Sequence, residues 1–190
     1  MDVLLSGTSA TIVIQTTKKI YIGWVGDTLV ALQGSEKNVD QQNIKSQDLF
    51  MNYPPHRPTL TKEKIRIYNR RGEIRESPID GKSRIYMRAR MYPALLNSRS
   101  LGDLLGHQIG VSSEPSIKIH DILQNDKFLV IGTQSLWDFL GPEEVIEIIN
   151  ELGSKDLGAQ TDIIFQTLKE VALSDGSQID DTTVILSHIN

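Results

Sequence analysis

Three short apolar runs open the chain. They are rich in β-branched residues, are separated by polar or glycine-containing turns, and cover Thr11–Gln15, Ile20–Val25 and Thr28–Leu32. Runs of this length and composition are typical of β-strands, and their close spacing predicts an antiparallel meander. A buried strand is also predicted at Phe128–Ile131, followed by a small-residue turn and a polar rim. The last predicted strand is Thr183–Leu186.

Two stretches in the C-terminal half have the periodicity of helices. Their apolar residues recur at three- and four-residue spacing, so each helix would pack one face on a core. The predicted helices span Pro142–Leu152 and Thr161–Ala172. Proline suits the first turn of a helix, and the acidic residues after Pro142 suit its positive end. The inward positions are Val145, Ile148, Ile149 and Leu152 in the first helix and Ile164, Phe165, Leu168 and Val171 in the second.

The middle of the chain is more polar and predicts shorter elements. A helix is expected at Thr61–Arg71, with Thr61 as its N-terminal cap and Gly72 just past its end. Glu73–Arg90 predicts a hairpin. Two further elements are expected before the central strand, namely a short helical turn at Leu95–Asp103 and an edge strand at Glu114–Ile119.

Two clusters of arginine accompany these elements. Arg66, Arg70 and Arg71 end the predicted helix, where a solvated helix end is favoured over a phosphate site. Arg84, Arg88 and Arg90 could meet an acidic or phosphorylated partner, although a lone charge cluster is more often an ordinary surface.

The order of the elements indicates an α+β fold. Strands end the chain after helices, and few βαβ alternations occur, which favours a layered sandwich over a doubly wound fold. No repeat, low-complexity tract or linker interrupts the sequence. A chain of 190 residues can form one domain with a substantial core, so residues 1–190 are expected to form a single domain.

Composition narrows the possible partners and locations. A formal net charge of -4 argues against nucleic acid as a partner. No run of 18 or more apolar residues occurs, so no membrane span is expected. The N-terminal stretch lacks the basic region of a signal peptide, which favours an intracellular, cytoplasmic location. The absence of cysteine excludes disulfides and thiolate metal sites.

Three aspartates stand beside predicted strands. Asp27 follows a strand and a glycine, Asp138 lies beyond the central strand, and Asp180 precedes the last strand. If these strands are neighbours, the carboxylates share one rim, where they could bind Mg²⁺ or Mn²⁺. Spacing alone favours turn aspartates that face solvent. The histidines are expected at the surface rather than as ligands, namely His56, His107, His120 and His188.

Seven segments, in order, resemble the metal-dependent PPM family of serine/threonine protein phosphatases. They are SGTSATIVI, IGWVGDTLVAL, HRPTLTKEKIRIYNRRGEI, LNSRSLGD, SSEPSIKI, FLVIGTQSLWDFLGPEEVIEII and DDTTVIL, and they cover nearly the whole chain. The resemblance implies a sandwich of two antiparallel sheets flanked by helices. It also implies dependence on Mg²⁺ or Mn²⁺.

The resemblance also implies roles for particular residues. Asp180 matches an aspartate that binds the family's core metal pair, and Asp27 and Asp138 match positions of a third, weaker metal site. Gln134 stands where the family has another aspartate ligand of the core pair. A neutral amide cannot supply the charge that balances two divalent ions. Trp24 stands where a small polar residue is common.

A second departure concerns the family's first portion. Its phosphate-binding arginine and its Asp-Gly-His-Gly-Gly segment have no counterpart here. The site is therefore expected to be vestigial, with no confident catalytic residue. Inner strands would also be missing, so apolar faces such as that of Thr11–Gln15 should be exposed. A protein partner, or another part of a longer protein, is expected to cover this open side by strand addition.

Three hypotheses follow, in order of preference. The first is a catalytically inactive PPM-type domain that serves as a structural or regulatory protein-interaction module within a larger assembly. The second is an active phosphoserine/phosphothreonine phosphatase completed by a missing or separate N-terminal segment. The third is a regulatory domain of a larger multidomain protein that senses a ligand or metal through Asp27 and Asp138.

Overall fold

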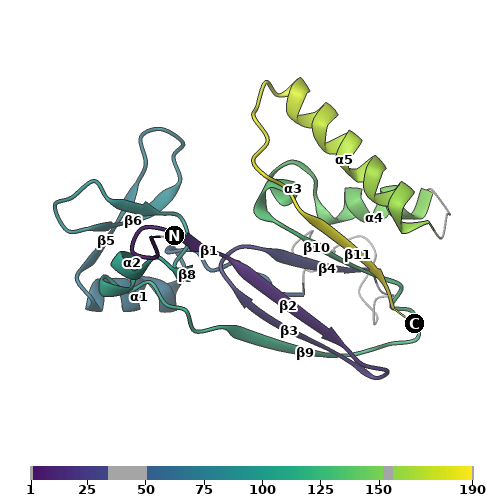
Figure 1. Cartoon of the computed structure of the whole chain (residues 1–190), viewed down its shortest axis with the longest axis horizontal. Helices are drawn as coiled ribbons and strands as arrows, with labels where there is room; N and C mark the ends of the chain where they lie inside the picture. The colour runs from purple at the N-terminus through teal and green to yellow at the C-terminus, as the bar shows by residue number, and fades with distance from the viewer. Residues whose placement is uncertain (1, 34–50, 152–155, 190) are drawn as a thin grey trace. The chain divides into compact units, whose positions relative to one another are not determined.

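The computed structural model describes residues 2–33, 51–151 and 156–189, and the fold is α+β, as predicted (Figure 1). Its contacts divide the chain into two compact units. Unit 1 comprises residues 1–13, 22–28 and 54–117, and unit 2 comprises residues 14–21, 29–53 and 118–190. No helix in the described ranges is long and apolar enough to cross a membrane.

Unit 2 contains a three-stranded antiparallel sheet in the order β11-β10-β4. The central strand β10 (Phe128–Gly132) pairs on one side with β4 (Leu29–Gln33) and on the other with β11 (Val184–His188). Its middle residue Val130 lies opposite Ala31 of β4 and Leu186 of β11. The buried strand expected at Phe128–Ile131 is therefore confirmed as the centre of this sheet.

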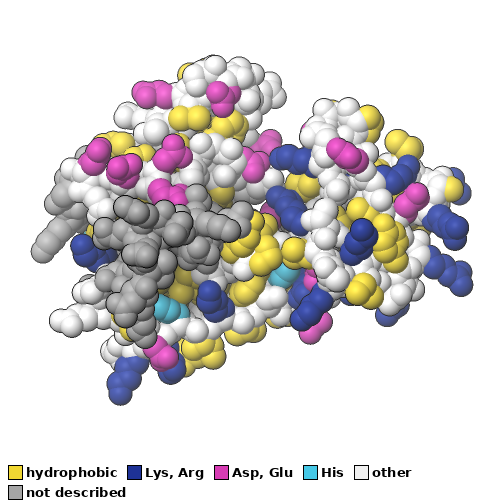
Figure 2. Space-filling model, turned by 180° about the vertical axis from the view of Figure 1, so that it is seen from behind, with side chains coloured by type: hydrophobic (Ala, Val, Ile, Leu, Met, Phe, Trp, Pro, Cys, Tyr) yellow, Lys and Arg dark blue, Asp and Glu magenta, His cyan; other side chains and the backbone are white. Residues whose placement is uncertain are grey.

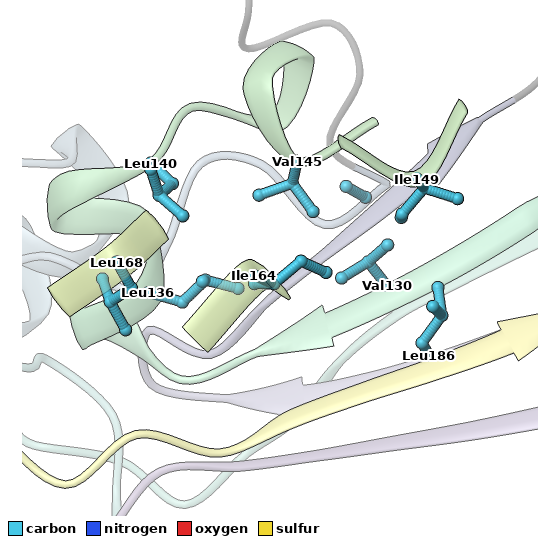
Figure 3. Packing of buried hydrophobic residues seen from close by; sticks show 9 residues of the cluster. Val130, Leu136, Leu140, Val145, Ile149, Ile164, Leu168 and Leu186 are labelled. Carbon is cyan, nitrogen blue, oxygen red and sulfur yellow. The ribbon is translucent and has the colours of Figure 1, made fainter. Parts of the chain in front are cut away.

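Three helices pack on this sheet, namely α3 (Gln134–Phe139), α4 (Pro142–Glu151) and α5 (Leu157–Ser174). Figure 3 shows their apolar side chains pointing toward those of the strands. The buried core of unit 2 consists of Ala31, Val130, Leu136, Leu140, Val145, Ile149, Ile164, Leu168 and Leu186. Apolar burial of this kind is the main stabilising contribution to a fold.

The two predicted helices are confirmed, with altered bounds. The first begins at Pro142 as expected and buries Val145 and Ile149, while Leu152 lies outside the described residues. The second begins at Leu157 instead of the predicted Thr161. The reason is Asp156, whose side chain accepts hydrogen bonds from the first backbone N–H groups of α5 and so caps the helix four residues earlier.

The polar rim expected after the central strand is instead the short helix α3. The indole Nε1 of Trp137 donates a hydrogen bond of 2.9 Å to the Gly132 carbonyl at the end of β10. Leu136 and Leu140 are buried in the core. These two residues are spaced for a helix rather than for an extended rim, which explains the difference.

Unit 1 contains a second three-stranded antiparallel sheet, in the order β5-β6-β7. Its strands are β5 (Gly72–Glu76), β6 (Ser83–Met87) and β7 (Pro93–Leu95). The predicted hairpin is confirmed by the pairing of β5 with β6. The helix α1 (Thr61–Asn69) precedes this sheet, and its Ile67 joins the small buried cluster of Ile85, Ile109 and Val111.

Two expectations for the ends of α1 are wrong. Leu60, rather than Thr61, is the N-cap, and no side-chain hydrogen bond caps the helix. At the other end the helix stops at Asn69 rather than at the predicted Arg71, and Arg71 has a left-handed backbone with φ of 61°. Gly72 already belongs to β5, where a Cβ atom would lie 2.4 Å from the Ile109 carbonyl oxygen. Close packing therefore explains the glycine.

The helical turn expected at Leu95–Asp103 is also wrong, because this segment is mostly extended. Arg99 forms a β-bridge with Ser112, and β8 (Leu101–Gly102) pairs with β1 (Gly7–Thr8). The backbone N–H of the buried Ser98 donates to the His56 carbonyl at 2.9 Å. These long-range bonds replace the local ones of a helix. The helix α2 (Leu104–Gln108) follows.

A third sheet contains β2 (Ala10–Gln15), β3 (Lys19–Val25) and β9 (Ser116–Asp121), in the order β2-β3-β9. The edge strand predicted at Glu114–Ile119 is therefore confirmed. The predicted meander is correct for β2 and β3 but wrong for β4, which belongs to the sheet of unit 2. Gly26, with φ of 95°, lies between β3 and β4 and redirects the chain.

Candidate functional site

Asp27 lies in unit 1, directly after β3 and Gly26, and its side chain is almost entirely buried. Its Oδ2 lies 3.2 Å from a guanidinium nitrogen of Arg57. The same nitrogen donates a hydrogen bond of 2.9 Å to Oδ1 of Asn97. A buried carboxylate needs a compensating charge, and here Arg57 supplies it. A metal ion at Asp27 would have to compete with this guanidinium.

His56 lies beside Asp27 and is buried, so its predicted place at the surface is wrong. The backbone N–H of Gly26 donates to Nδ1 at 3.1 Å, and Nε2 lies 2.9 Å from the Ser116 hydroxyl. Because Nδ1 accepts a hydrogen bond, the proton of the neutral ring is assigned to Nε2. Burial, followed by the positive charge of Arg99, lowers the pKa of His56 to about 4.

Trp24 explains part of this burial. Its ring stacks on that of His56 with centroids 5.7 Å apart and an interplanar angle of 9°. The His56 backbone N–H also donates to the Gly26 carbonyl at 2.9 Å, so ring and backbone together hold the turn before Asp27. A large aromatic side chain at position 24 therefore has a packing role here.

Glu63 is the centre of a buried polar cluster that the sequence did not reveal. Its side chain is 3% exposed and accepts hydrogen bonds from Arg66, Arg99 and the Ser98 hydroxyl at distances of 2.6–3.1 Å. Burial alone would raise the pKa of Glu63, but the hydrogen bonds from Arg99, Arg66 and Ser98 outweigh it and lower the pKa to about 2. The solvated helix end predicted for Arg66 is therefore wrong.

A signal for Glu63 was present in the helix pattern. Glu63 precedes the buried Ile67 by four residues, so both lie on the same face of α1. An acidic residue on the apolar face of a helix needs a buried basic partner. The sequence does not show which arginine provides it, because Arg99 is 36 positions away.

Gln134 and Asp138 lie on α3 in unit 2. The Gln134 side-chain amide donates a hydrogen bond of 3.1 Å to Oδ2 of the exposed Asp138. They are one helical turn apart, so this contact is local. The position where an aspartate ligand was expected thus carries a hydrogen-bond donor that points to another of the expected ligands.

Asp180 lies in the loop before β11, and its side chain is exposed. Its backbone carbonyl accepts a hydrogen bond of 3.2 Å from the hydroxyl of the buried Ser135. Thr133 and Thr183 are joined by two further hydrogen bonds of 3.0 and 3.1 Å. These contacts fix the loop of Asp180 beside the start of α3, so unit 2 brings this loop close to Gln134.

The chemistry of these residues does not fit a centre of two metal ions. Asp27 belongs to unit 1, and Asp138 and Asp180 belong to unit 2, so their shared rim stays a prediction. Within the described ranges, no three histidine, cysteine, aspartate or glutamate side chains gather as metal ligands. Two hard divalent cations need several carboxylates, and the described donors do not fit such a pair.

The strands β2, β3 and β9 leave large apolar side chains exposed. The exposed fractions are 66% for Ile12 and 58% for Ile14 on β2. They are 65% for Ile117 and 56% for Ile119 on β9. The exposure predicted for the strand within Thr11–Gln15 is confirmed. Within β3 the alternate residues Ile20, Ile22 and Trp24 are buried, as expected for a strand with one covered face.

Comparison with solved structures identifies the fold. A serine-threonine phosphatase 2C from Toxoplasma gondii superposes with a TM-score of 0.78 and 19% identity, covering 96% of this chain and 58% of that chain. A C. elegans sex determining protein gives a TM-score of 0.72 with 18% identity, covering 97% of this chain and 40% of that chain. The fold is thus that of the PP2C-type phosphatases, as the sequence predicted.

Sequence comparison defines the family. The model of the family Protein phosphatase 2C matches residues 2–179, so this chain belongs to the PP2C family. The probable protein phosphatase 2C 14 of Oryza sativa subsp. japonica is 28% identical over 186 residues, which are 97% of this chain and 35% of that protein. The chain thus spans about a third of this relative's length.

A relative of another kind is also similar. The adenylate cyclase of Lachancea kluyveri is 30% identical over 184 residues. The match covers 96% of this chain but only 8% of that protein. A segment similar to this chain therefore also occurs within a much longer protein with a different name.

Proposed function

We propose that this PP2C-type domain is catalytically inactive and serves as a structural or regulatory protein-interaction module. The observation that carries the proposal is the state of the expected metal ligands. Asp27 is paired with Arg57, and Asp138 accepts a hydrogen bond from Gln134. Both aspartates are already engaged by groups of the chain itself.

The charge of the expected metal ligands supports catalytic inactivity. The family is metal-dependent in general, and two divalent ions bring four positive charges that carboxylates must balance. Gln134 offers a neutral oxygen at one expected ligand position, and its amide nitrogen donates to Asp138. Water activation by a metal pair needs a fixed, charged ligand set. Asp180 alone does not provide one.

Exposed apolar surface supports the interaction role. Isolated apolar side chains are normal on a protein surface, but alternate apolar residues along one strand form a stripe. Ile12 and Ile14 form such a stripe on β2, and Ile117 and Ile119 form one on β9. Burying these side chains against a protein partner would contribute to binding at about 25 cal/mol per Å² of apolar surface, less the entropy lost on association.

A second candidate function is that of a regulatory domain within a larger multidomain protein. The match to the Lachancea kluyveri adenylate cyclase favours it, because that protein is at least ten times longer than the matched segment. In this case the partner that covers the apolar stripes would belong to the same chain. The apolar surface would then mediate contact between domains.

The test is hydrolysis of p-nitrophenyl phosphate by the purified chain in millimolar Mn²⁺, together with calorimetric titration of Mn²⁺. The proposal expects neither turnover nor Mn²⁺ binding. The variant Gln134→Asp restores a carboxylate at one position and should still be inactive, because together with Asp180 it would supply only two carboxylates for two divalent ions. Turnover that disappears in Asp180→Ala would overturn the proposal in favour of an active phosphatase.

The interaction role has its own test. The double variant Ile12→Ser and Ile117→Ser removes two exposed side chains, and Ile79→Ser, at a side chain that is 94% exposed on the β5–β6 turn, is the matched control. The proposal expects weaker binding of the dye ANS by the double variant alone, with the melting temperature unchanged. Equal dye binding by all three proteins would contradict an apolar docking surface.

A further inference from the structure

The strand β11 (Val184–His188) is an edge strand of the β11-β10-β4 sheet of unit 2 (Figure 1). Its antiparallel register with β10 is regular along its whole length. The Thr133 N–H donates to the Thr183 carbonyl at 3.1 Å. The Ile189 N–H donates to the Lys127 carbonyl at 2.9 Å. Because backbone groups alternate in direction along an antiparallel strand, the odd-numbered residues of β11 face β10. The N–H and C=O groups that point away from the sheet are those of Val184, Leu186 and His188.

These outward-facing groups form an open edge. Among the residues that the structure describes, none accepts a hydrogen bond from the three outward N–H groups, and the His188 carbonyl has only a local contact of 3.3 Å with the Ser187 hydroxyl. The other edge of the same sheet is covered. There the Val30 N–H donates to Oδ1 of Asn52 at 2.7 Å, and the Val30 carbonyl accepts from the Met51 N–H at 2.7 Å. A further strand can therefore pair with β11 but not with β4 at this point.

The strand β11 lacks the features that usually keep sheet edges from pairing. Natural edge strands are commonly protected by charged side chains, proline or bulges. The segment TTVILSHI, residues 182–189, contains no Asp, Glu, Lys, Arg or Pro, and its pairing with β10 has no bulge. Charged side chains are otherwise common in the chain. They are spread over the face of the molecule that Figure 2 shows, and α4 of the same unit contains several glutamates. Two copies of β11 would therefore meet without charge repulsion.

One large apolar side chain of β11 is exposed. Ile185 is 53% exposed, whereas Leu186, whose side chain points to the opposite face, is buried in the core of unit 2. Val184 and His188 keep partial contact with solvent. Strand addition at a sheet edge gains affinity from backbone hydrogen bonds and specificity from side-chain contacts. The edge of β11 offers both.

We propose that two copies of this chain form a symmetric dimer in which their β11 strands pair antiparallel. A twofold axis at Ile185 pairs the outward groups of Val184 with those of Leu186 in the second copy, and the reverse. Ile185 then lies opposite Ile185 of the second copy in a non-hydrogen-bonded pair, where side chains approach most closely. A register shifted by two residues would place Ile185 opposite Ser187 and cover less apolar surface. The dimer joins the two sheets into one continuous sheet.

Charge and symmetry favour a second copy as the occupant of this edge. Asp180 and Asp181 directly precede the strand and are exposed. In the antiparallel pair the two sets of aspartates lie at opposite ends, whereas a parallel pair would bring like charges together. Each copy supplies the same edge, so each outward donor meets an acceptor. One pair of strands forms a small interface, which makes the dimer weak and dependent on concentration.

The first experiment is sedimentation velocity of the purified whole chain over about 1–200 µM, a range suited to a small interface. The parent is expected to change from one copy to two as the concentration rises. The variant Ile185→Lys places two ammonium groups in the closest side-chain pair and should stay monomeric at the highest concentration. The matched control Leu173→Lys changes a side chain that is 78% exposed on α5 of the same unit, and its dissociation constant should lie within twofold of the parent's.

A single cysteine tests the register of the two strands. The chain contains no cysteine, so an introduced cysteine is its only thiol. The Cα atoms of a non-hydrogen-bonded antiparallel pair lie about 4.5 Å apart, within the range of a disulfide. With oxidised glutathione as the oxidant, Ile185→Cys should form a disulfide-linked dimer at least tenfold faster than Leu173→Cys at the same concentration. This variant introduces no charge, so it also tests the proposal should Ile185→Lys fail to fold.

The outcomes separate the possibilities. A dimer of the parent that is lost in Ile185→Lys, together with rapid cross-linking of Ile185→Cys, would support the proposal. A monomer at every concentration would overturn it and would favour a segment of another protein, or of a longer chain, at this edge. A dimer that persists in Ile185→Lys, or equal cross-linking of the two cysteine variants, would also overturn it. Phosphatase turnover would overturn the inactivity proposed above but would leave the mass of the parent in solution unaffected.

Discussion

The interiors of unit 2 and unit 1 contain different kinds of side chain. Unit 2 has an apolar core in which three helices pack on one sheet, and Val130, Ile164 and Leu168 are among its buried residues. Unit 1 has a small apolar cluster around Ile67, and beside it Glu63 is buried with its basic partners. Truncating a side chain in an apolar core lowers the free energy of unfolding in proportion to the volume lost. Removing one charge from a buried ion cluster lowers it because the partner charges are left buried and unpaired.

The largest effect is expected in the apolar core. Ile164→Ala should lower the free energy of unfolding by about 2–5 kcal/mol, because Ile164 is fully buried and its removal leaves a cavity. Denaturant titration measures the change. The control Ile185→Ala removes the same atoms from β11, where the side chain is 53% exposed, and should cost less than about 1 kcal/mol. Equal losses would show that the core of unit 2 is not as described.

The second largest effect on the free energy of unfolding is expected in the ion cluster of unit 1. Glu63→Gln removes the charge that balances Arg66 and Arg99 and should cost about 2–3 kcal/mol, since both arginines keep some contact with solvent. Glu73→Gln, at a half-exposed pair with Arg75, should cost less than about 1 kcal/mol. The same denaturant titration compares both variants with the parent. A loss for Glu63→Gln as small as that of its control would contradict a buried charge network.

The smallest effect concerns pH. The pKa of His56 in the folded state is about 4, below the ordinary value of 6.5, so the unfolded chain binds a proton that the folded chain does not. The neutral His56 ring therefore imposes no cost on folding above pH 6.5, and the free energy of unfolding decreases as the pH falls from 6.5 toward 4. The loss should be roughly 1–2 kcal/mol, less than the difference between the two pKa values implies, because the chain around a protonated ring can relax and admit solvent.

The variant His56→Gln isolates this contribution. Glutamine keeps an acceptor for the Gly26 N–H but does not titrate, so the slope of stability against pH between 6.5 and 4 should be shallower than in the parent. Below pH 4.5 both proteins should lose further stability as Glu63, whose pKa is lowered to about 2, is protonated. Identical slopes above pH 4.5 would show that His56 is accessible to protons in the folded state.

The sequence predicted the elements that its local patterns specify. The strand at Phe128–Ile131 and the helix that begins at Pro142 follow from apolar runs and periodicity, which local residues set. The family also followed from ordered segments along the whole chain. The contact between Gln134 and Asp138 could also have been predicted, because residues four positions apart in a helix are neighbours.

The errors occur where distant residues decide the local structure. β4 leaves the predicted meander because its partner β10 lies about a hundred residues further along the chain. The segment from Leu95 to Asp103 is extended because of bonds to His56 and Ser112 rather than helical by its own preference. Local patterns contain no information on such partners, so a one-sequence prediction favours the local alternative.

The sequence by itself determined the fold class, the family and the neutral residue at a position where a charged ligand was expected, because each is written in residue identity and order. Only the tertiary structure decided the burial of His56 and Glu63 and the pairing of Asp27 with Arg57. These features depend on which distant segments meet, and on the charges they bring with them, so they exist only once the chain has folded.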